Sequence, residues 1–158
     1  MSIDGRELRN ALGRFATGVC LITLETSEGE CIALTANSFS SVSLDPPLVL
    51  WSLQNNSDVF NHYATGQNFA INILSSDQQS LSDAYAKKGE HALDPTHFKP
   101  GVKGAPVIHG ALVSFECELE ATHEGGDHLI IVGRVHEMTA ADGGDPLLFF
   151  SGAYRGLA

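Results

Sequence analysis

The sequence predicts a mainly β protein, an antiparallel β-barrel closed by Greek-key connections with short helices beside it. Seven short runs have the length and the β-branched or alternating character of strands, whereas only two or three short segments have helical spacing. Strands and helices do not alternate regularly, so a parallel βαβ sheet is not expected. The chain of 158 residues has the size of one domain, and we expect residues 1–158 to form a single domain.

The composition is that of a globular protein, with 43% hydrophobic and 18% charged residues. Nine basic and nineteen acidic residues give a net charge of -10, which disfavours nucleic acid and anionic membrane surfaces as partners because like charges repel. Three cysteines without a C-x-x-C pair indicate a reducing compartment. The N-terminal segment also lacks the apolar core of a signal peptide, so we expect a cytoplasmic protein.

The N-terminal part is expected to hold one helix and one β-hairpin. Asp4 and Glu7 have the spacing of a capping box, and apolar residues follow at helical intervals, which predicts a helix over 5–16. The β-branched run 19–24 and the run 31–36 are separated by turn residues, which predicts a pair of antiparallel strands.

The next strand and helix are predicted from a proline break and from a capping residue. Because proline has no N–H to donate, Pro46 and Pro47 are expected to interrupt the ladder, and a new strand is predicted at 48–53. Ser57 is expected to cap a short helix that Gly66 ends.

The middle of the chain is predicted to contain a strand, a helix and a long loop. Residues 69–74 form a β-branched apolar run, and residues 77–88 have helical character with lysines in the last turn. The segment 90–106 is rich in Pro, Gly and His and lacks periodicity, so we expect a surface loop that acts as a mobile lid.

The C-terminal part contains the clearest strand signal. In the run 113–121 apolar residues alternate with polar ones, which predicts one buried and one solvated face. The polar positions are Ser114, Glu116, Glu118 and Glu120. A glycine-rich turn at 124–127 predicts a hairpin to a strand at 128–135, and 147–150 is the last predicted strand.

The stretch 35–43 attracts attention because six of its nine side chains carry a hydroxyl or an amide and none is charged. At the end of a strand such groups, together with main-chain N–H groups, make a neutral cradle for a phosphate or a polyol. The alternative interpretation is that the hydroxyls satisfy their own loop backbone, as turn residues often do.

The common nucleotide, zinc and hydrolase motifs are absent from the sequence. His123, Asp127 and His128 lie close in sequence, but their spacing across a glycine turn does not converge on an ion, so no metal site is expected. The cysteines lie in apolar runs, where cysteine usually acts as a small core residue. No set of residues has the pattern of a catalytic triad.

Taken together, the motifs resemble the short-chain flavin reductases of the split-barrel flavin-binding family, the reductase components of two-component flavin monooxygenases. The matching stretches are Arg14–Val19, Leu34–Pro47, Phe69–Leu74, Gly126–His128 and Phe149–Tyr154. They keep their order and extend over nearly the whole chain, and the second stretch is the most specific.

The resemblance implies a six-stranded antiparallel Greek-key split β-barrel with short flanking helices, assembled as a homodimer. It also implies an NAD(P)H:flavin oxidoreductase that binds FMN or FAD, reduces it with NADH or NADPH, and supplies reduced flavin to a separate monooxygenase component.

The resemblance further implies roles for individual residues. The ribityl phosphate and one edge of the isoalloxazine would contact Thr35, Ala36, Asn37, Ser38, Ser41 and Val42. The ring would be flanked by Trp51, Ser52 and Leu53, and Ser57 would reach the phosphate from a helix N-terminus. The nicotinamide cofactor would contact His128 and Tyr154, with Arg14 and Arg155 as weaker candidates for its phosphates.

This assignment fits the absence of an acid, a base or a nucleophile, because hydride transfer from nicotinamide to flavin is chemistry that the cofactors carry. The protein then acts by positioning, with His128 as a possible contributor. His128 has the alternative role of a hairpin cap, and Tyr154 that of a core aromatic. Two rival functions stay open: a flavoprotein that retains FMN as a prosthetic group for electron transfer, and a non-enzymatic flavin-binding protein.

Overall fold

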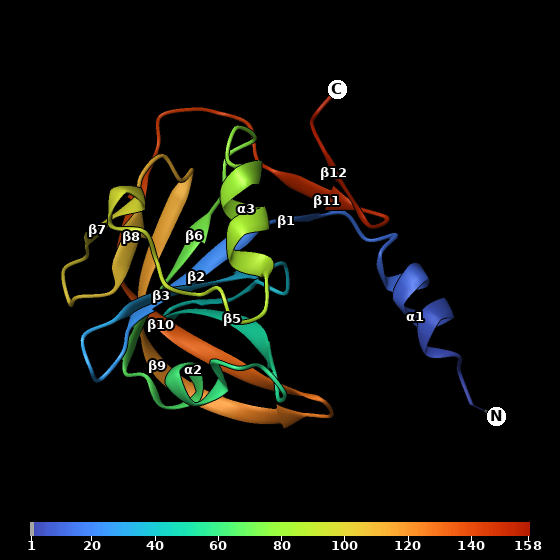
Figure 1. The fold of residues 1–158 in the computed structure, drawn as a ribbon, viewed down its shortest axis with the longest axis horizontal. Helices are drawn as coiled ribbons and strands as arrows, with labels where there is room; N and C mark the ends of the chain where they lie inside the picture. Colours follow the sequence, from blue (N-terminus) through green and yellow to red (C-terminus); the bar gives the residue numbers. More distant parts are fainter. Residues whose placement is uncertain (1) are drawn as a thin grey trace.

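Seven strands form the main sheet of the computed structural model, which describes residues 2–158 (Figure 1). In pairing order the strands are β3 (Cys31–Ala36), β2 (Cys20–Glu25), β6 (Asn68–Ile73), β9 (Val113–Gly125), β10 (His128–Ala140), β5 (Pro47–Gln54) and β4 (Ser40–Leu44). Every ladder in this sheet is antiparallel. The predicted mainly β, antiparallel class is therefore confirmed.

Two smaller sheets and a few short helices surround the main sheet. The small sheets contain β1 (Thr17–Gly18), β11 (Leu148–Phe150) and β12 (Ala153–Arg155), and β7 (Phe98–Pro100) with β8 (Pro106–Ile108). The helices are α1 (Gly5–Leu12), α2 (Phe60–Thr65), α3 (Gln79–Ala86) and a 3₁₀ turn (Pro95–His97). In Figure 1, α2 and α3 lie at opposite ends of the sheet, and α1 projects from the body beside β11 and β12.

The prediction of six strands is wrong, and no closed barrel is found. In residues 2–158 no ladder joins the two edge strands, β3 and β4. Within the main sheet, the strand that the sequence prediction missed is β4, which lies inside the hydroxyl-rich stretch expected to be a loop. Its side chains are mostly exposed and a bulge interrupts its register with β5, so it carries no alternating apolar pattern.

The sheet has apolar clusters on both faces, and β2 contributes to both. Cys20, Ile22 and Leu24 pack in one cluster with Trp51 and Phe69. Val19 and Leu21 pack in the other, beneath α3 and the β7–β8 hairpin. This two-sided burial explains why 19–24 reads as a continuous apolar run instead of an alternating one.

The buried side-chain amide of Asn72 connects strands from different parts of the sequence. Asn72 Nδ2 donates to the Leu21 carbonyl and to Thr23 Oγ1, both at 3.0 Å. Asn72 Oδ1 accepts from the Ile108 N–H at 3.1 Å and from Ser114 Oγ at 2.7 Å. One side chain thus joins β2, β6, β8 and β9, and all its hydrogen-bonding groups are satisfied.

The hairpin of β9 and β10 is confirmed, but both strands are longer than predicted. The loop contains only Gly126 and Asp127, and Gly126 has a φ of 67°, a conformation that favours glycine. Polar, exposed residues extend β9 to Gly125 and β10 to Ala140, so the apolar alternation that identified the strands stops before the ladder does.

The first and last predicted helices are shorter in the structure. Asp4 caps α1 through bonds to the N–H groups of Arg6 and Glu7, but the helix ends at Leu12 and not at residue 16. The residues after Gly13 turn instead toward β1. The predicted 77–88 helix is reduced to α3.

The segment 90–106 is not the mobile loop that the sequence suggested. Its first part runs along the edge of β3, where the Ala33 N–H donates to the His91 carbonyl and the Leu93 N–H donates to the Cys31 carbonyl, both at 2.9 Å. His91 and Leu93 are buried. Farther along, the segment contains the 3₁₀ turn and β7, so the prediction of a loop without regular structure is wrong.

The expected solvated face of β9 is wrong at two positions, Ser114 and Glu116, which are both buried. Glu116 is only 3% exposed, and its carboxylate accepts from the Val102 N–H at 2.7 Å. Glu118 and Glu120 do face solvent, where they pair with Lys103 and Arg134. Within residues 2–158, no helix has the length and apolar character needed to cross a membrane.

Candidate functional site

A cavity of about 280 Å³ lies between the end of β3, the middle of β5 and the tip of the β9–β10 hairpin. Its lining residues are Leu34, Thr35, Ala36, Asn37, Ser38, Trp51, Ser52, Leu53, Gln54, Ser57, Ala86 and His128. The lining contains no Asp, Glu, Lys or Arg, so it is neutral apart from the imidazole. The fold therefore brings together nine of the residues that the sequence singled out, from three separate stretches of the chain.

Two hydroxyls of the predicted cradle are used to hold the cavity walls together. Ser38 Oγ accepts from the Ser52 N–H at 2.9 Å and donates to the Ser52 carbonyl at 3.2 Å, which fastens the loop after β3 onto β5. Thr35 Oγ1 donates to the Ser82 carbonyl at 2.7 Å and ties β3 to α3. These two hydroxyls bond to backbone groups of other elements and not to their own loop backbone, which the alternative interpretation had proposed.

Asn37 is different from its neighbours. It is exposed, lines the cavity, and its side-chain amide makes no hydrogen bond within residues 2–158. An amide carries both donors and an acceptor, so it can pair with either kind of group on a ligand.

The alternation of β5 decides which of its side chains can meet a ligand. The Trp51 indole is 0% exposed and packs edge-on against Tyr63 with a centroid separation of 5.3 Å. Leu53 is also buried in the core, whereas Ser52 points to the other face of the sheet. Trp51 and Leu53 line the cavity although their side chains are buried in the core, and their place beside a flavin ring stays a prediction.

His128 begins β10, as the sequence predicted, and it is among the residues that line the cavity. The hairpin tip is held in place by Asn55, whose N–H donates to the Asp127 carbonyl at 3.0 Å and whose side-chain amide donates to the Gly126 carbonyl at 3.1 Å. His128 Nδ1 lies 2.7 Å from the Asp127 carboxylate. Because an ionised carboxylate only accepts, Nδ1 carries the proton and Nε2 is the nitrogen left for a ligand. The hydrogen bond from His128 lowers the pKa of the Asp127 carboxyl.

Ser57 lines the cavity, but it does not cap α2 itself. The residue before α2 is Val59, which makes no side-chain cap, and the Val59 N–H donates to Ser57 Oγ at 3.3 Å. Ser57 therefore stabilises the turn that leads into the helix.

Five predicted residues lie outside the lining of this cavity: Ser41, Val42, Tyr154, Arg155 and Arg14. Ser41 and Val42 are exposed at the bulge of the edge strand β4. Tyr154 packs against Phe149 and shares a hydrogen bond of 2.6 Å with Ser82 Oγ. Arg155 is exposed at the end of β12.

A second hollow, of about 870 Å³, lies between α1 and the body of the protein, and Arg14 is among the residues that line it. Asn37 and Ser38 line both this hollow and the neutral cavity, so the two meet at the loop after β3. A third hollow, of about 390 Å³, lies elsewhere beside Glu25 and Lys103 and contains none of the predicted site residues.

Three lining residues were not predicted from the sequence: Leu34, Gln54 and Ala86. They carry no chemistry that would distinguish them from strand and helix residues elsewhere. Ala86 reaches the cavity only because α3 packs against β3. No sequence signal identifies that contact.

The cavity suits a flavin in its chemistry. The isoalloxazine is a flat, mostly uncharged ring with hydrogen-bonding groups along one edge, and the cavity offers a neutral wall with the free amide of Asn37 and the hydroxyls of Ser52 and Ser57. None of the cavity-lining groups is a carboxylate that would repel a phosphate.

Comparison with known proteins identifies the family of the chain. A model of the flavin reductase like domain matches residues 12–158. The chain is 47% identical, over 96% of its length and 85% of the other protein, to the FMN reductase (NADH) SmoA of Agrobacterium fabrum. It superposes on the NADH:FAD oxidoreductase SgcE6 of Streptomyces globisporus with a TM-score of 0.91 and 34% identity, covering 100% of this chain and 97% of the other.

Some relatives are longer than this chain. It is 37% identical to the reductase component of the flavin-dependent trigonelline monooxygenase of Acinetobacter baylyi, over 94% of this chain but 48% of that protein. These matches extend over nearly every strand described above, including β3, β5 and the β9–β10 hairpin that form the cavity. The chain belongs to the family of flavin reductase like domains.

Proposed function

We propose that the neutral cavity between β3 and β5 binds FMN or FAD and that the protein is an NAD(P)H:flavin oxidoreductase. The observation that carries this proposal is the convergence, on one uncharged cavity, of the loop after β3, the outward face of β5 and His128. The similarity to an FMN reductase (NADH) and to an NADH:FAD oxidoreductase supports both the oxidation of the nicotinamide cofactor and the reduction of the flavin. Residues 1–158 act as a single domain in this proposal.

Each element of the site has one task. The main chain of 35–38 and the Asn37 amide hold the polar edge of the flavin, and Ser52 contacts the ring from β5. Ser57 lies toward the phosphate end. His128, fixed by Asp127, presents Nε2 to the nicotinamide side of the cavity.

The bound cofactors supply the redox chemistry, a hydride passing from the nicotinamide to the flavin. The chain itself positions the two cofactors and shields part of their surface from water. No side chain of the site has to act as an acid or a base. Arg14, in the adjoining hollow, is the candidate to meet a phosphate of the nicotinamide cofactor.

We propose a homodimer in which a second copy of the chain covers α1 and its surroundings. No residue of α1 is buried, and Leu8, Leu12 and Phe15 are 47%, 66% and 79% exposed. Apolar exposure of this extent marks an association surface in a protein of this size. The hollow between α1 and the body lies beside this surface, so the second copy would complete the wall of the site.

The reduced flavin is passed to a separate flavin-dependent monooxygenase component in this proposal, as the name of the Acinetobacter baylyi relative suggests for that protein. We further propose that the curved main sheet is the split barrel of the family and that the protein works in the cytoplasm.

Steady-state oxidation of NADH, measured with and without added free FMN, tests the function. We expect the rate to depend on added flavin and to saturate with it. A rate that is independent of added FMN, from a protein that stays yellow after dialysis, would favour a prosthetic flavin. Flavin binding without NADH oxidation would favour the non-enzymatic alternative. Repeating the assay with FAD and with NADPH identifies the preferred pair.

A further inference from the structure

Ser82 lies in the middle of α3, and none of its surface is exposed. A buried hydroxyl costs free energy unless it is hydrogen-bonded, and alanine favours a helix more than serine does. The hydrogen bonds of this serine therefore distinguish it from a residue that only fills space. Its main-chain carbonyl and its hydroxyl each bond to a different element.

The carbonyl of Ser82 holds one wall of the flavin cavity. Thr35 Oγ1 donates to it at 2.7 Å, and Thr35 lines the cavity from the end of β3. Ala86, which also lines the cavity, follows Ser82 by four residues on α3. Residues four apart lie on the same side of a helix, so the bond from Thr35 fixes the side of α3 that faces the cavity.

The hydroxyl of Ser82 contacts the C-terminal part of the chain. It shares a hydrogen bond of 2.6 Å with the Tyr154 hydroxyl of β12. Burial is the main cause that raises the pKa of the Tyr154 phenol, so this hydroxyl keeps its proton at neutral pH. Tyr154 lies opposite Phe149 in the ladder of β11 and β12, and the two rings pack edge-on with their centroids 5.3 Å apart.

Phe149 lines the second hollow, the one between α1 and the body of the protein. Ser82 is therefore linked to the flavin cavity through Thr35 and to the second hollow through Tyr154 and Phe149. The two hollows also meet at Asn37 and Ser38. Ser82 is thus a second connection between them, separate from the loop after β3 that they share.

The hairpin of β11 and β12 has other attachments that do not involve the Ser82 hydroxyl. The Ser151 N–H donates to the Gly13 carbonyl at 2.8 Å. The Leu147 N–H, just before β11, donates to the Leu74 carbonyl at 3.1 Å. Loss of the bond between Ser82 and Tyr154 should therefore shift the hairpin without unfolding it.

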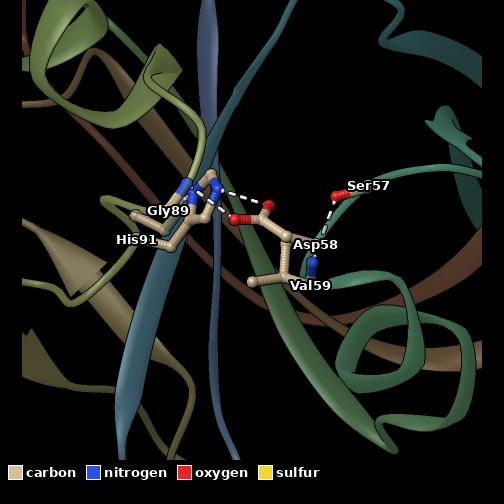
Figure 2. Close-up of polar contacts among 6 residues, drawn as sticks. Ser57, Asp58, Val59, Gly89 and His91 are labelled. Carbon is tan, nitrogen blue, oxygen red and sulfur yellow. Dashed lines mark hydrogen bonds and ion pairs between the residues drawn. The ribbon is translucent and has the colours of Figure 1, made fainter.

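The C-terminal end of α3 is held independently as well. Figure 2 shows Asp58 directed at the segment after α3. The Asp58 carboxylate accepts from the Gly89 N–H at 2.6 Å and lies 2.9 Å from His91 Nε2. The buried His91 ring also contacts β3, with Nδ1 3.0 Å from the Ala33 carbonyl. Loss of the Ser82 hydroxyl therefore removes one contact of α3 and leaves the end of the helix in place.

We propose that Ser82 is a positioning residue that sets the separation of the flavin and the nicotinamide cofactor, by holding Thr35 directly and Phe149 through Tyr154. The inference rests on the proposed function, with the flavin in the neutral cavity and the nicotinamide cofactor extending into the second hollow. Hydride transfer needs the two rings in contact, and its rate falls steeply when they are displaced. Ser82 is buried and lines neither hollow, so it acts on the rate through the residues that do.

The test compares the wild type with Ser82→Ala, Tyr154→Phe and the double variant in anaerobic stopped-flow reduction of bound FMN by NADH. Ser82→Ala keeps the carbonyl that Thr35 bonds, and Tyr154→Phe keeps the ring that packs on Phe149. We expect each variant to lower the limiting rate at saturating NADH roughly tenfold, since a misplacement of about 1 Å can cost about a hundredfold. The Kd for FMN should be unchanged, because the contacts of the flavin cavity are retained.

The double variant should be no slower than either single variant, because both substitutions remove the same hydrogen bond. Ser80→Ala is the matched control, since Ser80 is exposed on the same helix and lines neither the cavity nor the second hollow. It should match the wild type in both rate and FMN affinity.

An unchanged limiting rate in Ser82→Ala and Tyr154→Phe would overturn the positioning role, and so would rate losses that multiply in the double variant. A merely structural role predicts that FMN affinity and the thermal midpoint fall together with the rate, and that result would also overturn the inference. If Ser82→Ala does not fold, Tyr154→Phe removes the same bond from its other end and decides the question. A wild-type protein that binds no FMN, or whose bound FMN is not reduced by NADH, would instead overturn the proposed function and the positioning role with it.

Discussion

At the scale of single residues, the site separates polar groups that build the cavity from those that are free to bind. The hydroxyls of Ser38 and Thr35 are committed to β5 and α3. The amide of Asn37 and Nε2 of His128 have no such commitment within residues 2–158. A cavity whose walls are fixed by internal hydrogen bonds is preorganised for a flat ligand.

His128→Ala tests the division between flavin and nicotinamide contacts. Loss of one neutral hydrogen bond costs about 0.5–1.5 kcal/mol, so we expect the KM for NADH to rise roughly three- to tenfold. The Kd for FMN should change little. Tyr154→Phe is the companion variant and tests a different group, because the Tyr154 hydroxyl bonds to Ser82 and lies outside the cavity lining. A larger defect in FMN binding than in NADH use by His128→Ala would assign the imidazole to the flavin.

The three free cysteines should differ in reactivity. Burial raises the pKa of both Cys20 and Cys117 to about 12, so almost none of either thiol is ionised at pH 8. Cys31 is only partly buried. A disulfide reagent added to the native protein should therefore modify one thiol quickly and the other two only after unfolding. Rapid modification of all three would contradict the burial of Cys20 and Cys117.

At the scale of elements, the fold is joined by side chains that bridge strands from different parts of the sequence. Asn72 links β2, β6, β8 and β9, and Asn55 fastens the β9–β10 hairpin to the end of β5. The Asn55 bridge fixes the hairpin tip relative to the end of β5, which is one wall of the cavity. The position of His128 is therefore a consequence of sheet register and of the Asn55 contact.

Asn72→Ala should be strongly destabilising because it leaves the Ile108 N–H and other buried groups without partners. Each unpaired buried group costs about 1–3 kcal/mol, so we expect a loss of roughly 2–5 kcal/mol in the free energy of unfolding. Asn61→Ala is the control, because Asn61 is exposed on α2. Urea denaturation measures both, and similar stabilities for the two variants would be inconsistent with this role of Asn72.

At the scale of the whole molecule, the sequence predicts what depends on apolar pattern and local turn chemistry. The strands β2, β3, β5, β6, β9 and β10 and the Gly126 turn are of this kind. It does not predict β4, whose ladder uses main-chain groups beneath exposed polar side chains, nor the structure of 90–106, which depends on pairing with β3. The contribution of Ala86 to the cavity is likewise decided by how α3 packs against β3.

The exposed apolar surface around α1 predicts that activity depends on association. Substitution of Phe15 by Ser places a polar group on that surface, so we expect the dimer to dissociate at higher protein concentration than in the wild type. Sedimentation velocity over a dilution series, with NADH oxidation measured on the same samples, should show both changes together. A wild-type protein that is monomeric and fully active at all concentrations would exclude a site completed by the second copy.

The central claim, that the neutral cavity holds the flavin, is tested most directly by a crystal structure of the protein with FMN. We expect the isoalloxazine to lie between β5 and the loop after β3, within reach of Asn37, Ser52 and His128. The phosphate should lie beside Ser57. FMN bound instead in the hollow beside Glu25 and Lys103 would contradict the account.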